Sequence, residues 1–111
     1  MGAVEGEDGG FVAPGPLSIQ SEAQEEILEA YRYYESKEHG LGAEFRRAVE
    51  ACLNLITRQP RSYAIIEADV RRALLRRFPY GIFYMVEGHR IVVIACFHTS
   101  RDPAEWLRRI G

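Results

Sequence analysis

The sequence predicts an α+β fold in which an N-terminal helical hairpin packs on a small antiparallel β-sheet. Apolar residues recur at spacings of three and four up to about Ile56, as in amphipathic helices, and then in strand-like runs from Tyr63 to Phe97. The predicted element order is β-α-α-β-β-β-α. Because the helices come early and most strands later, a wound parallel sheet is excluded. The length of 111 residues suits one domain with one modest core.

Residues 1–16 are predicted to lie outside the fold, as a disordered leader or a remnant of expression. They contain five glycines, two prolines and three acidic residues, and little that could pack. The folded domain is therefore expected to span residues 17–111. It begins with a short strand at Leu17–Gln20, where apolar and polar residues alternate.

Two helices are predicted next. The first begins at Ser21, which has capping-box spacing to Gln24, and stops near Gly40, a residue suited to the left-handed conformation. Its apolar stripe consists of Ala23, Ile27, Ala30, Tyr31 and Tyr34. The face of the second helix carries Leu41, Phe45, Ala48, Val49, Cys52 and Ile56, and Pro60 closes that helix. Because the connection is short, the two helices should form a hairpin.

The second half of the chain is predicted to form the sheet. After a short apolar run at Tyr63–Glu67, extended segments are expected at Val70–Phe78, Tyr80–Val86 and Ile91–Phe97. Glu87 and Gly88 are predicted to make the hairpin turn between the last two. A short terminal helix follows, with Asp102 as its N-cap and Pro103 in its first position.

Composition indicates a soluble cytoplasmic protein. No stretch approaches the run of about 18 apolar residues that a membrane helix needs, and no secretory signal is visible. Cys52 and Cys96 lie in apolar surroundings without metal-ligand spacing, so both are predicted to be buried and reduced. Glycine-rich phosphate loops, zinc spacings and serine elbows are absent from the sequence, so neither a metal nor a cofactor is expected.

Charge is distributed unevenly along the chain. Residues 1–57 contain eleven acidic and four basic residues, whereas residues 58–111 contain five acidic residues and ten arginines. The second half therefore either offers a positive surface to an anionic partner or is neutralised within the fold by the first half. The acidic row of the first helix, which includes Glu22, Glu25 and Glu26, is expected to be a solvated face.

Four arginines fall on the predicted strand Val70–Phe78. Alternation along a strand places Arg72 and Arg76 on one face, and Arg71 and Arg77 on the other. Arginine is suited to bidentate recognition of phosphate or carboxylate. The alternative is that some of these arginines pair with acidic residues of the helices or of the neighbouring turn.

His98 ends the last predicted strand and is followed by Arg101. A histidine there could serve as the general base of a metal-free ribonuclease, with Arg101, Arg76 and Tyr84 completing the site. The alternative is a histidine that bonds loop backbone. Trp106 has two interpretations as well, a packing anchor or a contact to a partner.

Three segments together resemble the RelE/ParE superfamily of toxins. The first comprises Ser21–Ile27, Tyr33–Glu35 and Gly40–Gly42 with Phe45, the second is Val70–Gly81, and the third is Phe97–Pro103 followed by Trp106. The resemblance covers Leu17 to Arg109. It lies in the order and spacing of the segments, since no single motif is decisive.

This resemblance implies the toxin of a bacterial type II toxin–antitoxin pair, also called a plasmid stabilisation protein. A cognate antitoxin is the implied partner, folding along the toxin in a hetero-oligomer. RelE-like members cut messenger RNA on the ribosome without a metal, and ParE-like members poison DNA gyrase.

The segment from His98 to Asp102 is more similar to the ParE branch, and the chain lacks the lysine cluster of the RelE pattern. DNA gyrase is therefore the preferred target, with ribosome-dependent RNA cleavage, or a member without toxicity, as alternatives. The residues predicted to bind target or antitoxin are Arg71, Arg72, Arg76, Arg77, His98, Arg101 and Trp106.

Overall fold

The computed structural model describes residues 15–110, so most of the predicted leader, residues 1–16, lies outside the described part of the chain. The elements are β1 (Leu17–Ile19), α2 (Ser21–Lys37), α3 (Leu41–Arg58), β2 (Ile65–Glu67), β3 (Val70–Leu74), β4 (Tyr80–Glu87), β5 (Arg90–His98), the 3-10 helix η1 (Pro103–Trp106) and α4 (Leu107–Ile110). The predicted α+β class is confirmed. Among the described residues, no helix is long and apolar enough to cross a membrane.

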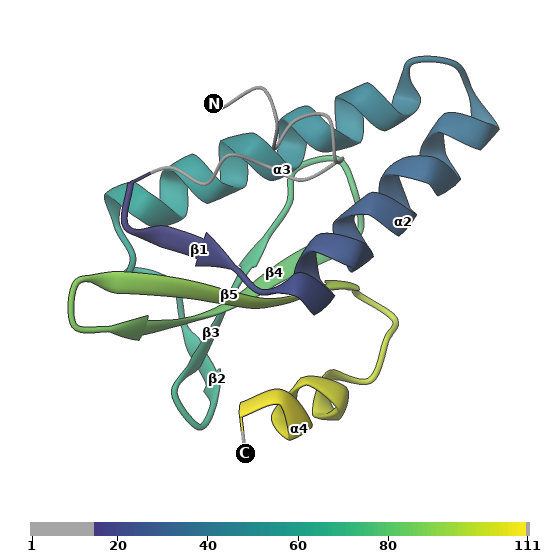
Figure 1. Ribbon diagram of the computed structural model, residues 1–111. Coiled ribbons are helices and arrows are strands. Elements are labelled where there is room, and N and C mark those ends of the chain that lie inside the picture. The colour runs from purple at the N-terminus through teal and green to yellow at the C-terminus, as the bar shows by residue number, and fades with distance from the viewer. Residues whose placement is uncertain (1–14, 111) are drawn as a thin grey trace.

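The sheet has five strands in the order β1-β5-β4-β3-β2 (Figure 1). All neighbouring strands are antiparallel except β1, which runs parallel to β5, so the sheet is mixed and not purely antiparallel as predicted. The short apolar run at Tyr63–Glu67 contains an additional edge strand, β2. Both edge strands have only three residues. Such strands are too short for the alternation of apolar and polar residues to indicate how they pair.

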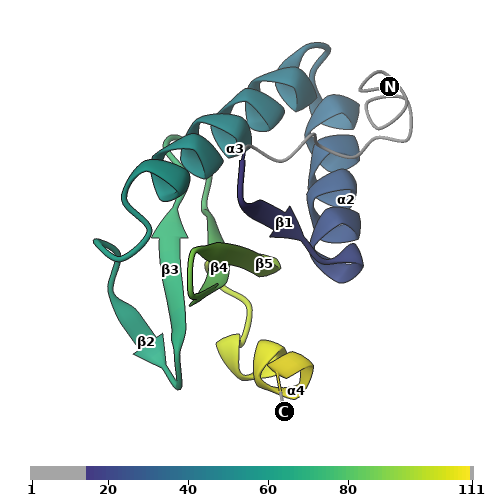
Figure 2. The ribbon, with the colours of Figure 1, turned by 60° about the vertical axis from the view of Figure 1, so that its left-hand side comes forward.

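The helical hairpin covers one face of the sheet, and η1 with α4 covers part of the other (Figure 2). Gly40 turns the chain between the helices at a φ of 90°, as predicted. The Glu35 carboxylate then accepts hydrogen bonds from the backbone N–H groups of Gly40 and Gly42. A Cβ atom on Gly42 would lie 2.8 Å from the Tyr31 carbonyl oxygen, so the close approach of the helices requires glycine there.

Each face of the sheet has its own core. Between the sheet and the hairpin, the largest fully buried side chains include Phe45, Leu53, Ile56 and Tyr84. Beneath η1 and α4, the second core consists of Val70, Phe83, Ile94, Ala95, Phe97 and Trp106. The two cysteines are buried and unpaired, as predicted.

The strand predicted at Val70–Phe78 is shorter than expected. β3 ends at Leu74, and residues 75–79 form a tight bend closed by a hydrogen bond from the Leu75 N–H to the Tyr80 carbonyl. Leu75 and Phe78 both turn into the helix-facing core, which breaks the alternation of an extended strand. Arg77 accordingly has a φ of 72°, in the left-handed region.

Two local predictions about element ends were wrong. The N-cap of α2 is Gln20, no side chain caps it, and the Gln24 amide donates to the Ile19 carbonyl instead of forming a capping box. The turn between β4 and β5 consists of Gly88 and His89, because Glu87 already pairs with Arg90 in the ladder. Asp102, in contrast, caps η1 as predicted, accepting from the Ala104 N–H at 3.0 Å.

Candidate partner-binding site

The four arginines predicted on one strand divide into two pairs with different surroundings. Only Arg71 and Arg72 lie on β3, and Arg76 and Arg77 lie in the bend that follows it. The prediction that Arg72 and Arg76 share a strand face is therefore wrong. The chain leaves the strand at Leu74 because Leu75 enters the core.

Arg71 and Arg77 are used within the fold. The Arg71 Nη1 atom donates to the carbonyl oxygens of Arg61 at 3.1 Å and Tyr63 at 2.6 Å, which fixes the loop after α3. The Arg77 Nη2 atom lies 2.9 Å from the Glu44 carboxylate of α3. The alternative interpretation, that some arginines pair with helix acids, is confirmed for Arg77.

The side chains of Arg72 and Arg76 are exposed and form no hydrogen bond or ion pair within residues 15–110. The Arg72 stem lies over Gly81, where a Cβ atom would be 3.3 Å from the Arg72 Cγ. The stem is thus packed while its guanidinium stays open to solvent. Both side chains retain all of their donors for a carboxylate or phosphate group.

A groove of about 450 Å³, here called the α3 groove, lies between α3 and the end of β3. It is lined by Glu44, Arg47, Ala48, Ala51, Cys52, Leu55, Tyr63, Leu74, Arg76, Arg77 and Phe78. Leu55 and Leu74 are 44% and 55% exposed, which is unusual for large apolar side chains. Since Glu44 is already paired with Arg77, the groove combines an apolar floor with a positive rim.

The outer edge of β3 is free beside this groove. Within the described chain, β2 pairs with Val70 and Arg71, the Arg72 N–H donates to the Ala64 carbonyl at 3.3 Å, and no strand covers the edge beyond it at Leu74. Unpaired strand edges are templates for an added strand of another chain. The α3 groove therefore has both apolar surface and open backbone hydrogen-bonding groups at one border.

The sequence of α3 contains apolar residues that line this groove, beside the stripe that faces the core. Ala48, Ala51 and Leu55 recur at spacings of three and four, offset from the buried residues Cys52 and Ile56. Ala48 is half-buried and packs against the helix-facing core, whereas Ala51 and Leu55 are exposed. From the sequence we expect the antitoxin to cover the arginine-bearing sheet face and an exposed groove beside the helices, but Ala51 and Leu55 were not predicted as part of that groove.

His98 lies in a separate hollow beside α2, the α2 hollow, of about 260 Å³. It is lined by Glu26, Glu29, Ala30, Tyr33, Tyr80, Cys96, His98 and Arg101. The His98 Nδ1 atom accepts a hydrogen bond from the Ser100 backbone N–H at 3.0 Å. In a neutral ring the proton is then on Nε2, so the ring has no free lone pair to act as a general base. The loop-bonding interpretation of His98 is confirmed.

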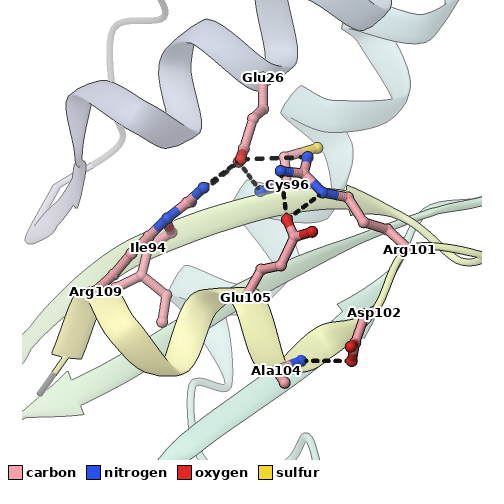
Figure 3. A network of polar contacts seen from close by, with 8 residues as sticks. All are labelled: Glu26, Ile94, Cys96, Arg101, Asp102, Ala104, Glu105 and Arg109. Atoms are coloured by element: carbon pink, nitrogen blue, oxygen red, sulfur yellow. Dashed lines mark hydrogen bonds and ion pairs between the residues drawn. The ribbon is translucent and has the colours of Figure 1, made fainter.

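Arg101 is neutralised at the border of the α2 hollow (Figure 3). Its Nε atom lies 2.7 Å from the Glu105 carboxylate, and its Nη1 atom lies 3.5 Å from that of Glu26. Its guanidinium also stacks 4.0 Å above the centre of the Phe97 ring. A partner phosphate would have to compete with two carboxylates for this side chain.

Tyr84 and Trp106 are buried and unavailable to a partner in this structure. The Tyr84 side chain is 0% exposed, its hydroxyl donates to the Pro60 carbonyl at 2.7 Å, and burial raises its pKa to about 12. Trp106 is 1% exposed and packs 5.8 Å from the Phe83 ring, which supports the interpretation as a packing anchor.

The residues predicted for a ribonuclease site are consequently not brought together. Tyr84 is enclosed under α3, Arg76 borders the α3 groove, and His98 with Arg101 borders the α2 hollow. The α2 hollow does place Glu29, Tyr33 and Tyr80 near Arg101, but Arg101 is engaged by two carboxylates and the His98 Nδ1 atom by the Ser100 N–H.

Comparison with known proteins assigns residues 17–103 to a family described as the ParE toxin of the type II toxin–antitoxin system parDE. Among solved structures, the fold is similar to the chromosomal ParDE toxin–antitoxin system from P. aeruginosa, with a TM-score of 0.57 and 15% sequence identity. That match covers 78% of this chain and 98% of the other. No curated protein matches the sequence significantly.

Proposed function

The chain belongs to the ParE toxin family of type II toxin–antitoxin systems, and we propose that it inhibits DNA gyrase and is neutralised by a cognate antitoxin seated in the α3 groove. The observation that carries this proposal is the groove itself, with its apolar floor, unpaired strand edge and unneutralised arginines. Gyrase, antitoxin and toxin would meet in the cytoplasm, which we propose as the location.

The chemistry of the α3 groove specifies the antitoxin segment that would fit it. The exposed Leu55 and Leu74 would pack against apolar side chains of the antitoxin. The free donors of Arg47 and Arg76 would bind its carboxylates. The open edge of β3 at Leu74 suits an extended backbone. A short acidic amphipathic chain that orders on binding meets all of these requirements.

Binding, not cleavage, is the action that the site favours. His98 has its acceptor nitrogen occupied, Arg101 is neutralised, and Tyr84 is enclosed. A protein that traps another enzyme on DNA needs surface contacts only, and Arg72 and Arg76 provide free cationic donors for such contacts. Arg76 lines the α3 groove and Arg72 does not. Of these two arginines, only Arg76 would therefore be contacted by both gyrase and the antitoxin.

Two assays with the purified protein test this proposal. In a gyrase supercoiling reaction we expect inhibition or trapped DNA breaks. In a translation reaction with a reporter message we expect the message to stay intact. Ribosome-dependent cuts that disappear in His98→Ala would overturn the gyrase proposal in favour of a ribonuclease, and inactivity in both assays would indicate a member without toxicity.

The antitoxin is tested separately. The reading frame next to the gene should encode a small acidic chain, and that chain should bind the purified toxin and restore gyrase activity. If the neighbouring frames encode nothing of this kind, the antitoxin part of the proposal fails while the gyrase assay still stands.

A further inference from the structure

The C-terminal segment Arg101–Ile110 is attached to the rest of the protein in an unusual way. Residues 102–110 form no backbone hydrogen bond to the sheet within the described chain; the Glu105 N–H bonds only to the Asp102 carbonyl. The Arg101 N–H donates to the His98 carbonyl at 2.9 Å, and residues 102–110 are held by side chains alone. The segment can leave the sheet without breaking any bond between strands.

Its polar attachment converges on Glu26 of α2 (Figure 3). The Arg109 Nη2 atom lies 2.6 Å from the Glu26 Oε2 atom, and Arg109 Nη1 lies 3.3 Å from Oε1. Arg109 Nη1 also donates to the Ile94 carbonyl at 2.8 Å, and Arg101 approaches the same carboxylate. The Glu26 side chain is only 11% exposed, so these contacts are shielded from water.

The prediction that the acidic row of the first helix is a solvated face is wrong for Glu26. Besides the two arginines, its carboxylate accepts from the Cys96 backbone N–H at 2.9 Å. One side chain thereby connects α2, β5 and the C-terminal segment.

The apolar attachment is incomplete. Trp106 is enclosed against Phe83, but its Nε1–H has no hydrogen-bond partner among the described residues. A buried donor without a partner reduces the stability that burial of the ring provides. Leu107 and Ile110, the other large apolar residues of the segment, are only partly buried.

From this attachment we infer that residues 101–110 form a releasable strap, which opens as a unit when the Glu26 contacts break and uncovers an apolar face of the sheet. That face comprises Val70, Phe83, Ile94, Ala95 and Phe97. Segments with few buried contacts open well below the cost of global unfolding. The inference does not depend on the proposed function.

Hydrogen exchange of the full-length protein measures strap opening, and Trp106, the single tryptophan of the chain, reports on it by fluorescence. In Glu26→Gln we expect the amides of residues 104–110 to exchange at least about 10-fold faster, with stronger quenching of Trp106 by acrylamide, because an ionic contact is lost. Exchange in β4, and in β5 apart from the Cys96 amide that bonds Glu26 directly, should not change. Glu25→Gln, on the neighbouring exposed position, should behave as the wild type.

Two further variants change residues of the strap itself. They test whether faster exchange in Glu26→Gln reflects only a general loss of stability. Arg109→Met should accelerate exchange of the strap alone, and Arg108→Met, the adjacent exposed arginine, should not. Unchanged strap exchange in both Glu26→Gln and Arg109→Met would overturn the inference. So would equal acceleration of the strap and of β4 and β5, since the segment would then open only with the whole fold.

Discussion

Acidic, aromatic and arginine residues line both the α3 groove and the α2 hollow. The two sites differ in whether their arginines are paired with carboxylates. In the hollow, Glu26 and Glu105 both engage Arg101. At the groove, Glu44 engages Arg77 alone, and Arg47 and Arg76 keep their donors free within the described chain. The availability of an arginine for a partner is thus decided by which helix carboxylates lie within reach. The exposed fraction of an arginine side chain does not by itself distinguish the α3 groove from the α2 hollow.

The largest effect is expected at the free arginines. Arg72→Ala combined with Arg76→Ala should abolish growth arrest and weaken target binding at least about 100-fold, because each charge-assisted hydrogen bond contributes about 1.5–3 kcal/mol. Cooperative thermal unfolding should persist close to the wild-type Tm, because neither guanidinium has a hydrogen-bond or ion-pair partner among residues 15–110. Arg32→Ala with Arg58→Ala, at two other exposed sites, is the matched control. A lower Tm with arrest lost in proportion would assign Arg72 and Arg76 to the fold.

The floor of the α3 groove should control the antitoxin. Ala51→Glu places a negative charge where an acidic segment would pack, and we expect antitoxin affinity to fall about 10- to 100-fold through like-charge repulsion. Calorimetric titration measures this, with Asn54→Glu, on the same helix but outside the groove lining, as control. Gyrase inhibition by free toxin should be retained. Equal affinities of the two variants would remove the groove as the docking site.

Arg101 should matter for stability and not for toxicity. Arg101→Ala removes a half-exposed ion pair and a contact with the Phe97 ring, and we expect a loss of about 1 kcal/mol in the free energy of unfolding. Growth arrest should remain, in contrast to the Arg72 and Arg76 pair. Denaturant titration beside Arg108→Ala checks the size of the loss. Loss of arrest at wild-type stability would make the α2 hollow, not the groove, the working surface.

The smallest effect concerns the turn between α2 and α3. Hydrogen bonds from the Gly40 and Gly42 N–H groups lower the pKa of Glu35 below its ordinary value of 4.5. A depressed carboxyl pKa stabilises the fold above the ordinary value, and this stabilisation is lost as the pH falls through the folded-state pKa. Glu35→Gln should therefore be less stable than wild type near neutral pH, and the difference should shrink in acid. A constant difference across that range would contradict the role of the carboxylate, with Glu38→Gln as control.

The sequence alone was sufficient for the fold class, the helical hairpin and the family. These depend on local signals, namely the apolar stripes of α2 and α3, the left-handed Gly40 and the Asp102 cap, which neighbouring residues determine among themselves. The uneven charge distribution predicted that the arginines of the second half serve either an anionic partner or neutralisation within the fold.

Only the tertiary structure decided which arginines are free and which side chains are enclosed. Arg77 meets Glu44, Tyr84 meets the Pro60 carbonyl, and Arg109 meets Glu26 across separations of 24 to 83 residues. No local pattern encodes such pairings, because they depend on how α2, α3 and the C-terminal segment are placed on the sheet. The parallel direction of β1 and the end of β3 at Leu74 also follow from long-range packing. At the end of β3, burial of Leu75 and Phe78 outweighs the local preference for continuing the strand.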